Sequence, residues 1–124
     1  MKVHYEEESD LEPLVRSLEP DLLVSFYFRK MIPGRVLALA PRGALNLHGS
    51  LLPRLRGRAP LNWALVECEE RTGVTLHHMT EKPDAGDIVA QRGFDIGPRD
   101  TARTLFERAV VETRRLLWDV WSKV

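Results

Sequence analysis

The sequence predicts an α/β protein in which a mostly parallel sheet carries helices on both faces. A short β-forming stretch at 2–5 and two apolar runs, 22–28 and 44–47, alternate with helical patterns, so the elements follow in the order β, α, β, α, β. This alternation is typical of parallel strands joined by right-handed crossovers. A chain of 124 residues is expected to form a single domain, 1–124, with a core of its own.

The composition is that of an ordinary globular protein and excludes several classes. Apolar residues make up 44% and charged residues 29% of the chain. The 18 basic residues equal the 18 acidic ones, so no net positive charge favours nucleic acid as a partner. Cys68 is the single cysteine, which excludes an internal disulfide and a cysteine-based metal site. Without a signal-peptide pattern or a membrane-length apolar run, we expect a cytoplasmic protein.

The first third of the chain predicts two strands and two helices. Residues 2–5 suggest a short strand, and the acidic residues 6–10 suggest a solvated loop. Ser9 or Asp10 can cap a helix that ends near Leu18, because leucine and valine recur there at helical spacing. The nearly unbroken apolar run 22–28 predicts a strand buried on both faces and paired on both edges. A short helix should follow from Pro33 to Ala40, and then a turn at 41–43.

The stretch 46–60 contains the residues best suited to chemistry. Asn46 and His48 are two positions apart at the end of a predicted strand, so their side chains should point to the same side. Gly49, Pro53 and Gly57 then break the strand into a loop. Polar groups at the carboxyl end of a strand are typical of active sites in open α/β sheets. Taken alone, Asn46 is better explained as a turn residue and His48 as a hydrogen-bonded core histidine.

The middle of the chain predicts a helix at 59–69 and an antiparallel pair of strands at 73–79 and 88–96, joined through a turn at 83–86. Cys68 falls on the apolar face of the helix, so we interpret it as a small core residue. His77 and His78 should face opposite sides of their strand, so at most one can face a cleft. Neither has a partner at metal-ligand spacing, and both are interpreted as structural.

A long amphipathic helix is predicted after Pro98, with Asp100 as its N-cap. Apolar positions recur along it at helical spacing, and Trp118 and Trp121 are expected in the core. The two adjacent apolar stripes consist of Leu105, Ala109, Leu116 and Val120, and of Phe106, Val110, Leu117 and Trp121.

Four motifs occur in a fixed order: Asn-x-His-x-Ser-Leu-Leu-Pro from Asn46, Arg-Gly-x-x-Pro from Arg56, Thr-Gly-Val-Thr from Thr72, and Asp-Ala-Gly-Asp-Ile from Asp84. Together they resemble the 10-formyltetrahydrofolate-dependent formyltransferases. The resemblance implies a Rossmann-like formyltransferase fold. Members of that family begin with two further strand–helix units before the position of Lys2, so the chain should be the C-terminal part of a formyltransferase catalytic domain, with those N-terminal units missing.

The resemblance also implies roles for three residues. Asn46 should stabilise the tetrahedral intermediate, His48 should donate a proton, and Asp84 should tune His48. This suits formyl transfer to an amine, which needs proton movement and stabilisation of an oxyanion but no metal. Asp84 could instead do no more than hold a β-turn, and Asp87 is an alternative carboxylate three residues later.

The co-substrate implied by the resemblance is 10-formyltetrahydrofolate. The positions that match the family's folate site follow three of the predicted strands, and contacts from backbone groups suit the edge of a pterin. These positions are Lys30, Met31, Ile32, Arg58, Thr80, Glu81, Lys82, Pro83 and Asp84.

The acceptor is suggested by residues 58–63, Arg-Ala-Pro-Leu-Asn-Trp, which resemble the formyltransferase domain acting on UDP-4-amino-4-deoxy-L-arabinose. This implies a nucleotide-linked amino sugar as substrate and a role in lipid A modification. The alternatives are a fragment of a methionyl-tRNA formyltransferase, a hydrolase releasing formate, and a non-catalytic folate-binding remnant. If the edge of strand 22–28 is unpaired, copies of the chain should also self-associate there.

Overall fold

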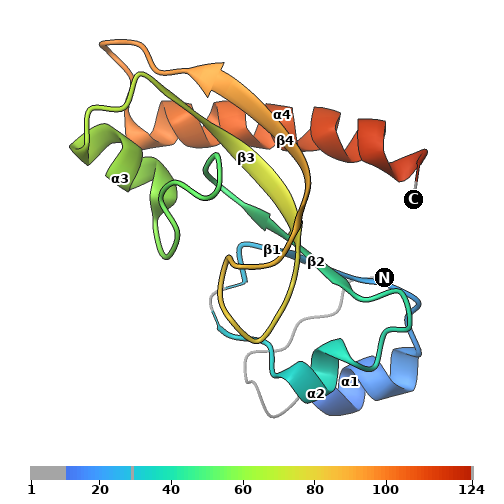
Figure 1. Cartoon of the computed structure of the whole chain (residues 1–124). Coiled ribbons are helices and arrows are strands. Elements are labelled where there is room, and N and C mark those ends of the chain that lie inside the picture. The colour runs from blue at the N-terminus through green and yellow to red at the C-terminus, as the bar shows by residue number, and fades with distance from the viewer. Residues whose placement is uncertain (1–10, 29, 124) are drawn as a thin grey trace.

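The computed structural model describes residues 11–28 and 30–123, and it contains one mixed sheet of four strands in the order β1-β2-β3-β4 (Figure 1). The strands are β1 (Leu23–Phe26), β2 (Ala44–His48), β3 (Arg71–His78) and β4 (Ile88–Asp95). β1 and β2 are parallel, whereas β2–β3 and β3–β4 are antiparallel. The α/β class and the predicted antiparallel pair are confirmed. Parallel pairing among the described strands is limited to β1 and β2. The strand, loop and cap expected at 2–10 lie outside the described residues.

Four helices accompany the sheet: α1 (Leu11–Leu18), α2 (Gly34–Leu37), α3 (Pro60–Val66) and α4 (Ala102–Trp121). Each lies where a helix is predicted, although α2 and α3 end about a turn earlier than expected. None of the helices described is both long enough and apolar enough to cross a lipid bilayer.

The main core lies between α4 and one face of the sheet. Leu45 and Leu47 of β2, together with Val74 and Leu76 of β3, pack in one buried cluster with residues of α4. In Figure 1, α4 runs behind β3 and β4. Since side chains alternate along a strand, Asn46 and His48 are left on the opposite face of β2. The apolar alternation therefore places the polar pair away from the main core.

A second cluster packs α1 and α2 against β1. Leu11 and Val15 of α1 and Val36 of α2 form it, and Leu23 of β1 packs against them. Leu23 pairs with Ala44, which shares its face of β2 with Asn46. The helices therefore cover both faces of the sheet, as predicted.

Strand β1, whose apolar run is typical of a strand covered on both faces, has one face partly open in the described part of the chain. Val24 and Phe26 are 36% and 42% exposed. Among the described strands β1 pairs only with β2, so it forms an edge of the sheet. The apolar sequence of β1 suits burial on both faces, but the described residues do not cover the face that carries Val24 and Phe26.

Three residues expected in the core are exposed. Cys68 lies beyond the end of α3, in a left-handed backbone conformation with φ 52°, and is exposed. Trp118 and Trp121 are 83% and 66% exposed. At about 3.6 residues per turn they fall on the side of α4 opposite Leu105. Trp121 lies at the far edge of the second predicted stripe, and Trp118 lies outside both stripes.

The predicted N-cap of α4 is displaced by one residue. Thr101 is the cap: its hydroxyl accepts a hydrogen bond from the Thr104 amide, and the Thr104 hydroxyl accepts one from the Thr101 amide. Asp100 instead bonds the Arg108 guanidinium, the Gly97 amide and the Thr104 hydroxyl. These contacts, with that of Arg108 the strongest, lower the pKa of Asp100 to about 2.

Candidate active site

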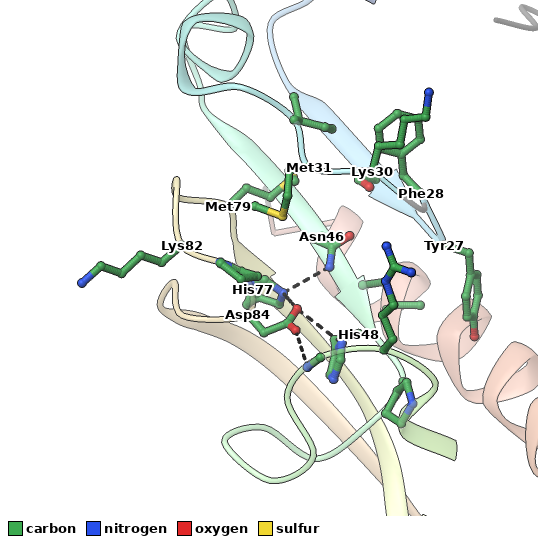
Figure 2. Close-up of a pocket in the computed structure, with 18 of the residues that line it drawn as sticks. Tyr27, Phe28, Lys30, Met31, Asn46, His48, His77, Met79, Lys82 and Asp84 are labelled. Carbon is green, nitrogen blue, oxygen red and sulfur yellow. Dashed lines mark hydrogen bonds and ion pairs between the residues drawn. The ribbon is translucent and has the colours of Figure 1, made fainter. Parts of the chain in front are cut away.

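A pocket of about 870 Å³ lies over the polar face of β2. Its walls come from three segments, which follow β1, β2 and β3 respectively, and Figure 2 shows their side chains converging. The volume falls in the range of roughly 300–1,000 Å³ that is typical of small-molecule sites. Asn46 and His48 both line it, which confirms that their side chains share one face.

His48 contacts a hydrogen-bond acceptor at each ring nitrogen. Its Nδ1 lies 3.3 Å from Oδ1 of Asp84, and its Nε2 lies 2.8 Å from the carbonyl oxygen of Leu55. The side chains of His48 and Asp84 are only 7% and 12% exposed. Carboxylate and carbonyl oxygens can only accept, so the ring satisfies both contacts when it carries both protons. This geometry suits a residue that donates a proton.

Three local features fix the position of Asp84. Its Oδ2 accepts a hydrogen bond of 2.9 Å from the Gly57 amide. Its backbone is left-handed, with φ 53°, a conformation that aspartate tolerates better than most residues. Gly86 lets the loop approach β3, because a Cβ there would lie 1.8 Å from the carbonyl oxygen of His78. The Asp-Ala-Gly motif thus permits a close approach of the loop to the sheet.

Asp87, the other carboxylate considered, lies outside the pocket lining and is exposed. Its carbonyl oxygen accepts a hydrogen bond of 2.8 Å from the His78 amide, which ties the loop to the end of β3. Asp84, not Asp87, is therefore the carboxylate beside His48.

The loop that follows β2 is fixed by Thr75, which ends the Thr-Gly-Val-Thr motif. The buried Thr75 hydroxyl donates to the Ser50 carbonyl at 2.7 Å and accepts from the Leu52 amide at 3.1 Å. Gln91 donates to both the Leu52 carbonyl and the Thr75 hydroxyl, each at 2.9 Å. The Leu52–Pro53 peptide is cis. This network places the Leu55 carbonyl that contacts His48.

Most residues predicted to bind folate line the pocket. They are Lys30, Met31, Ile32, Arg58, Thr80, Lys82, Pro83 and Asp84. Glu81 is outside the lining, and its side chain lies beside Gly34 at the start of α2. The Thr80 hydroxyl donates to the Lys82 carbonyl at 3.1 Å, which holds this segment in a tight turn. In the described part of the chain, no group of three or more histidine, cysteine, aspartate or glutamate side chains could hold a metal ion.

His77 is a pocket residue that the sequence interpretation missed. Its ring is 2% exposed, and its Nε2 lies 3.3 Å from the Asn46 amide nitrogen and 3.7 Å from Oδ1 of Asp84 (Figure 2). The sequence interpretation left both histidines as structural and allowed at most one of them to face the cleft; of the two, His77 lines the pocket and His78 does not. Alternation with the core residues Val74 and Leu76 could have placed it on the polar face.

Three apolar residues of the pocket were also missed: Tyr27, Phe28 and Met79. Each lies just beyond the end of a strand, and that position was the available signal. They give the pocket an apolar wall beside the polar group formed by Asn46, His48 and Asp84.

Comparison with known proteins gives a consistent family. Residues 1–120 match the family described as formyl transferase. Glycinamide ribonucleotide transformylase 1 from Symbiobacterium toebii is 28% identical, with a TM-score of 0.81 over 87% of this chain and 51% of that protein. Rv3404c from Mycobacterium tuberculosis, a candidate sugar N-formyltransferase, is 22% identical, with a TM-score of 0.80 over 94% of this chain and 48% of that protein.

A third similar structure, a formyltetrahydrofolate deformylase from Pseudomonas syringae pv. tomato, is 23% identical, with a TM-score of 0.80 over 90% of this chain and 37% of that protein. The last two likenesses show the fold alone. The chain spans about half the length of the first of these proteins. Because the family match covers nearly the whole sequence, the chain belongs to the formyl transferase family.

Proposed function

We propose that this chain carries the reacting centre for transfer of a formyl group from 10-formyltetrahydrofolate to an amine. The observation that supports this most directly is the convergence of Asn46, His48 and Asp84, from two separate segments, at one wall of the pocket. The three side chains supply an amide donor, a proton carrier and a negative charge. Those are the groups that the reaction requires.

Each residue has a distinct role in the proposed reaction. The acceptor amine attacks the formyl carbon and a new carbon–nitrogen bond forms, while the carbonyl oxygen becomes negative. An N–H of Asn46 donates to that oxygen, which contributes roughly 3 kcal/mol in comparable sites. The electron pair on the oxygen then re-forms the carbonyl, the bond to the folate nitrogen breaks, and this nitrogen takes a proton from His48. The proton that the amine loses on attack returns His48 to its protonated form. Asp84 stabilises the positive charge of the His48 ring.

The character of the pocket fits a folate. Met31, Ile32, Phe28 and Met79 provide apolar contact for a flat ring system. The turn at 80–83 exposes backbone donors and acceptors beside them, which suits the hydrogen-bonding edge of a pterin. When bound, the folate supplies the formyl group and the nitrogen that leaves.

For the acceptor we propose an amino sugar linked to a nucleotide. The support is the segment 58–63, which resembles the domain acting on UDP-4-amino-4-deoxy-L-arabinose, and its first residue, Arg58, lines the pocket. The exposed guanidinium of Arg58 suits a phosphorylated substrate. Glycinamide ribonucleotide is the second candidate, because the similar protein from S. toebii acts on it and is the more identical of the named transferases.

The test is incubation of the protein with 10-formyltetrahydrofolate and one acceptor at a time. The acceptors are UDP-4-amino-4-deoxy-L-arabinose, glycinamide ribonucleotide and none, and mass spectrometry detects the formylated product. We expect product from the amino sugar only. Product from glycinamide ribonucleotide alone would show that this compound, and not the amino sugar, is the acceptor. Formate released without any acceptor would indicate a hydrolase. Folate binding without turnover in all three would refute catalysis and leave a folate-binding remnant.

A further inference from the structure

Asn46 and His77 face each other across the sheet. They are direct partners in the antiparallel register of β2 and β3, so their side chains are neighbours on the polar face. The Asn46 amide nitrogen lies 3.3 Å from Nε2 of His77. In Figure 2 this nitrogen points towards His77 and Asp84, and the amide oxygen points away. An asparagine amide can turn by half a rotation and exchange its donor for its acceptor, so a further contact must fix this orientation.

The contact made by the other ring nitrogen of His77 fixes the orientation of the Asn46 amide. Nδ1 of His77 lies 2.9 Å from the main-chain carbonyl oxygen of His78. A carbonyl oxygen only accepts, so this contact requires the proton on Nδ1. In a neutral ring Nε2 then carries a lone pair, and the group opposite must be a donor. The amide nitrogen of Asn46 is that donor, and its oxygen is excluded from this position.

A doubly protonated His77 fits less well. Its Nε2–H would need an acceptor, and the nearest carboxylate oxygen, Oδ1 of Asp84, is 3.7 Å away, beyond hydrogen-bond distance. The same oxygen is nearer to His48, at 3.3 Å. A proton on Nε2 would also oppose the N–H groups of Asn46. The neutral ring with its proton on Nδ1 satisfies all these contacts.

We propose that His77 is a positioning residue, whose tautomer, set by the His78 carbonyl, holds the Asn46 amide with its nitrogen towards the reacting centre. One N–H of Asn46 is used by His77, and the second remains for the oxygen of the intermediate. The tautomer and the amide orientation follow from contacts within the chain. Only their consequence for catalysis rests on the proposed function.

The first test needs no turnover. Long-range ¹H–¹⁵N spectra of the ¹⁵N-labelled 124-residue chain at neutral pH report the proton positions of each ring. We expect a protonated Nδ1 and an unprotonated Nε2 for His77, and a coupling across the hydrogen bond between Nε2 and the Asn46 side-chain nitrogen. A proton on Nε2, alone or together with one on Nδ1, would overturn the proposal. His77→Gln assigns the signals, because it removes this ring alone.

The second test separates positioning from mere packing. In the single variant His77→Leu, transfer should fall by up to about a hundredfold, as when an oxyanion donor is lost. In an Asn46→Ala background the same change should cost less than about twofold, because the group that His77 positions is already absent. His77→Gln should recover part of the rate, since its amide oxygen can accept from Asn46. Equal losses in both backgrounds would overturn the positioning role of His77. That result would not count against formyl transfer, which the acceptor experiment tests separately.

Discussion

Replacement of Asp84 by asparagine removes the negative charge and the acceptor beside Nδ1 of His48 without changing the size of the side chain. The new side chain has nearly the same shape, and its oxygen can still accept the hydrogen bond from the Gly57 amide, which is 2.9 Å long in the native chain. The loop should therefore stay in place. Any loss of rate then reports what the carboxylate contributes to His48, as a negative charge and as an acceptor at Nδ1.

The magnitude follows from the separation of the two groups. At 3.3 Å, with an effective dielectric constant of about 20, a carboxylate attracts an imidazolium by about 5 kcal/mol. Holding the carboxylate largely out of water offsets about half of this, leaving a net contribution of about 2–3 kcal/mol. Since about 1.4 kcal/mol corresponds to a tenfold change in rate, the loss should be about 30- to 150-fold.

The assay is release of tetrahydrofolate, followed by absorbance, because it reports both transfer and hydrolysis. Asp87→Asn is the matched control: the residue is exposed, and only its main-chain carbonyl is used, so the rate should change by less than about twofold. Thermal unfolding of both variants shows whether the fold is intact. A rate within threefold of the native one for Asp84→Asn, or an equal loss for Asp87→Asn, would refute the reasoning.

Four further predictions concern single sites. His48→Ala should abolish turnover but retain folate binding in titration calorimetry, and an active variant would contradict the proton-donor role. Gly86→Ala should destabilise the fold by about 1–3 kcal/mol in a denaturant melt, because its Cβ would lie 1.8 Å from the His78 carbonyl oxygen; native stability would show that the loop can move away freely. Asp100→Asn should lower the melting temperature at neutral pH, and the difference from the native chain should shrink as pH falls through 2 and vanish well below it. The pKa of Asp100 is lowered to about 2, so its stabilisation is full above the ordinary carboxyl pKa and lost as pH falls through 2; a difference that persists well below 2 would contradict this. The chain should self-associate through the edge of β1, and Phe26→Lys should weaken this in size-exclusion chromatography; a native chain that is monomeric at all concentrations would contradict it.

The local pattern of the sequence determined the elements and the polar pair. Alternation along β2 places Leu45 and Leu47 on one face and Asn46 and His48 on the other, and this depends only on backbone geometry. Helical spacing likewise located α1 and the buried stripe of α4. The motifs at Asn46 and Asp84 carried the resemblance to the family, which the comparisons confirm.

Only the tertiary structure decided which of these side chains meet. Asp84 is a long way along the chain from His48, and their contact depends on a turn that brings the loop after β3 back over β2. His77 lines the pocket because β2 and β3 pair in the register that places it opposite Asn46. This register cannot be derived from the sequence of either strand alone. The exposure of Trp118 was likewise decided by which side of α4 faces the sheet. Local periodicity gives each side chain a direction, whereas the packing of whole elements decides what it meets there.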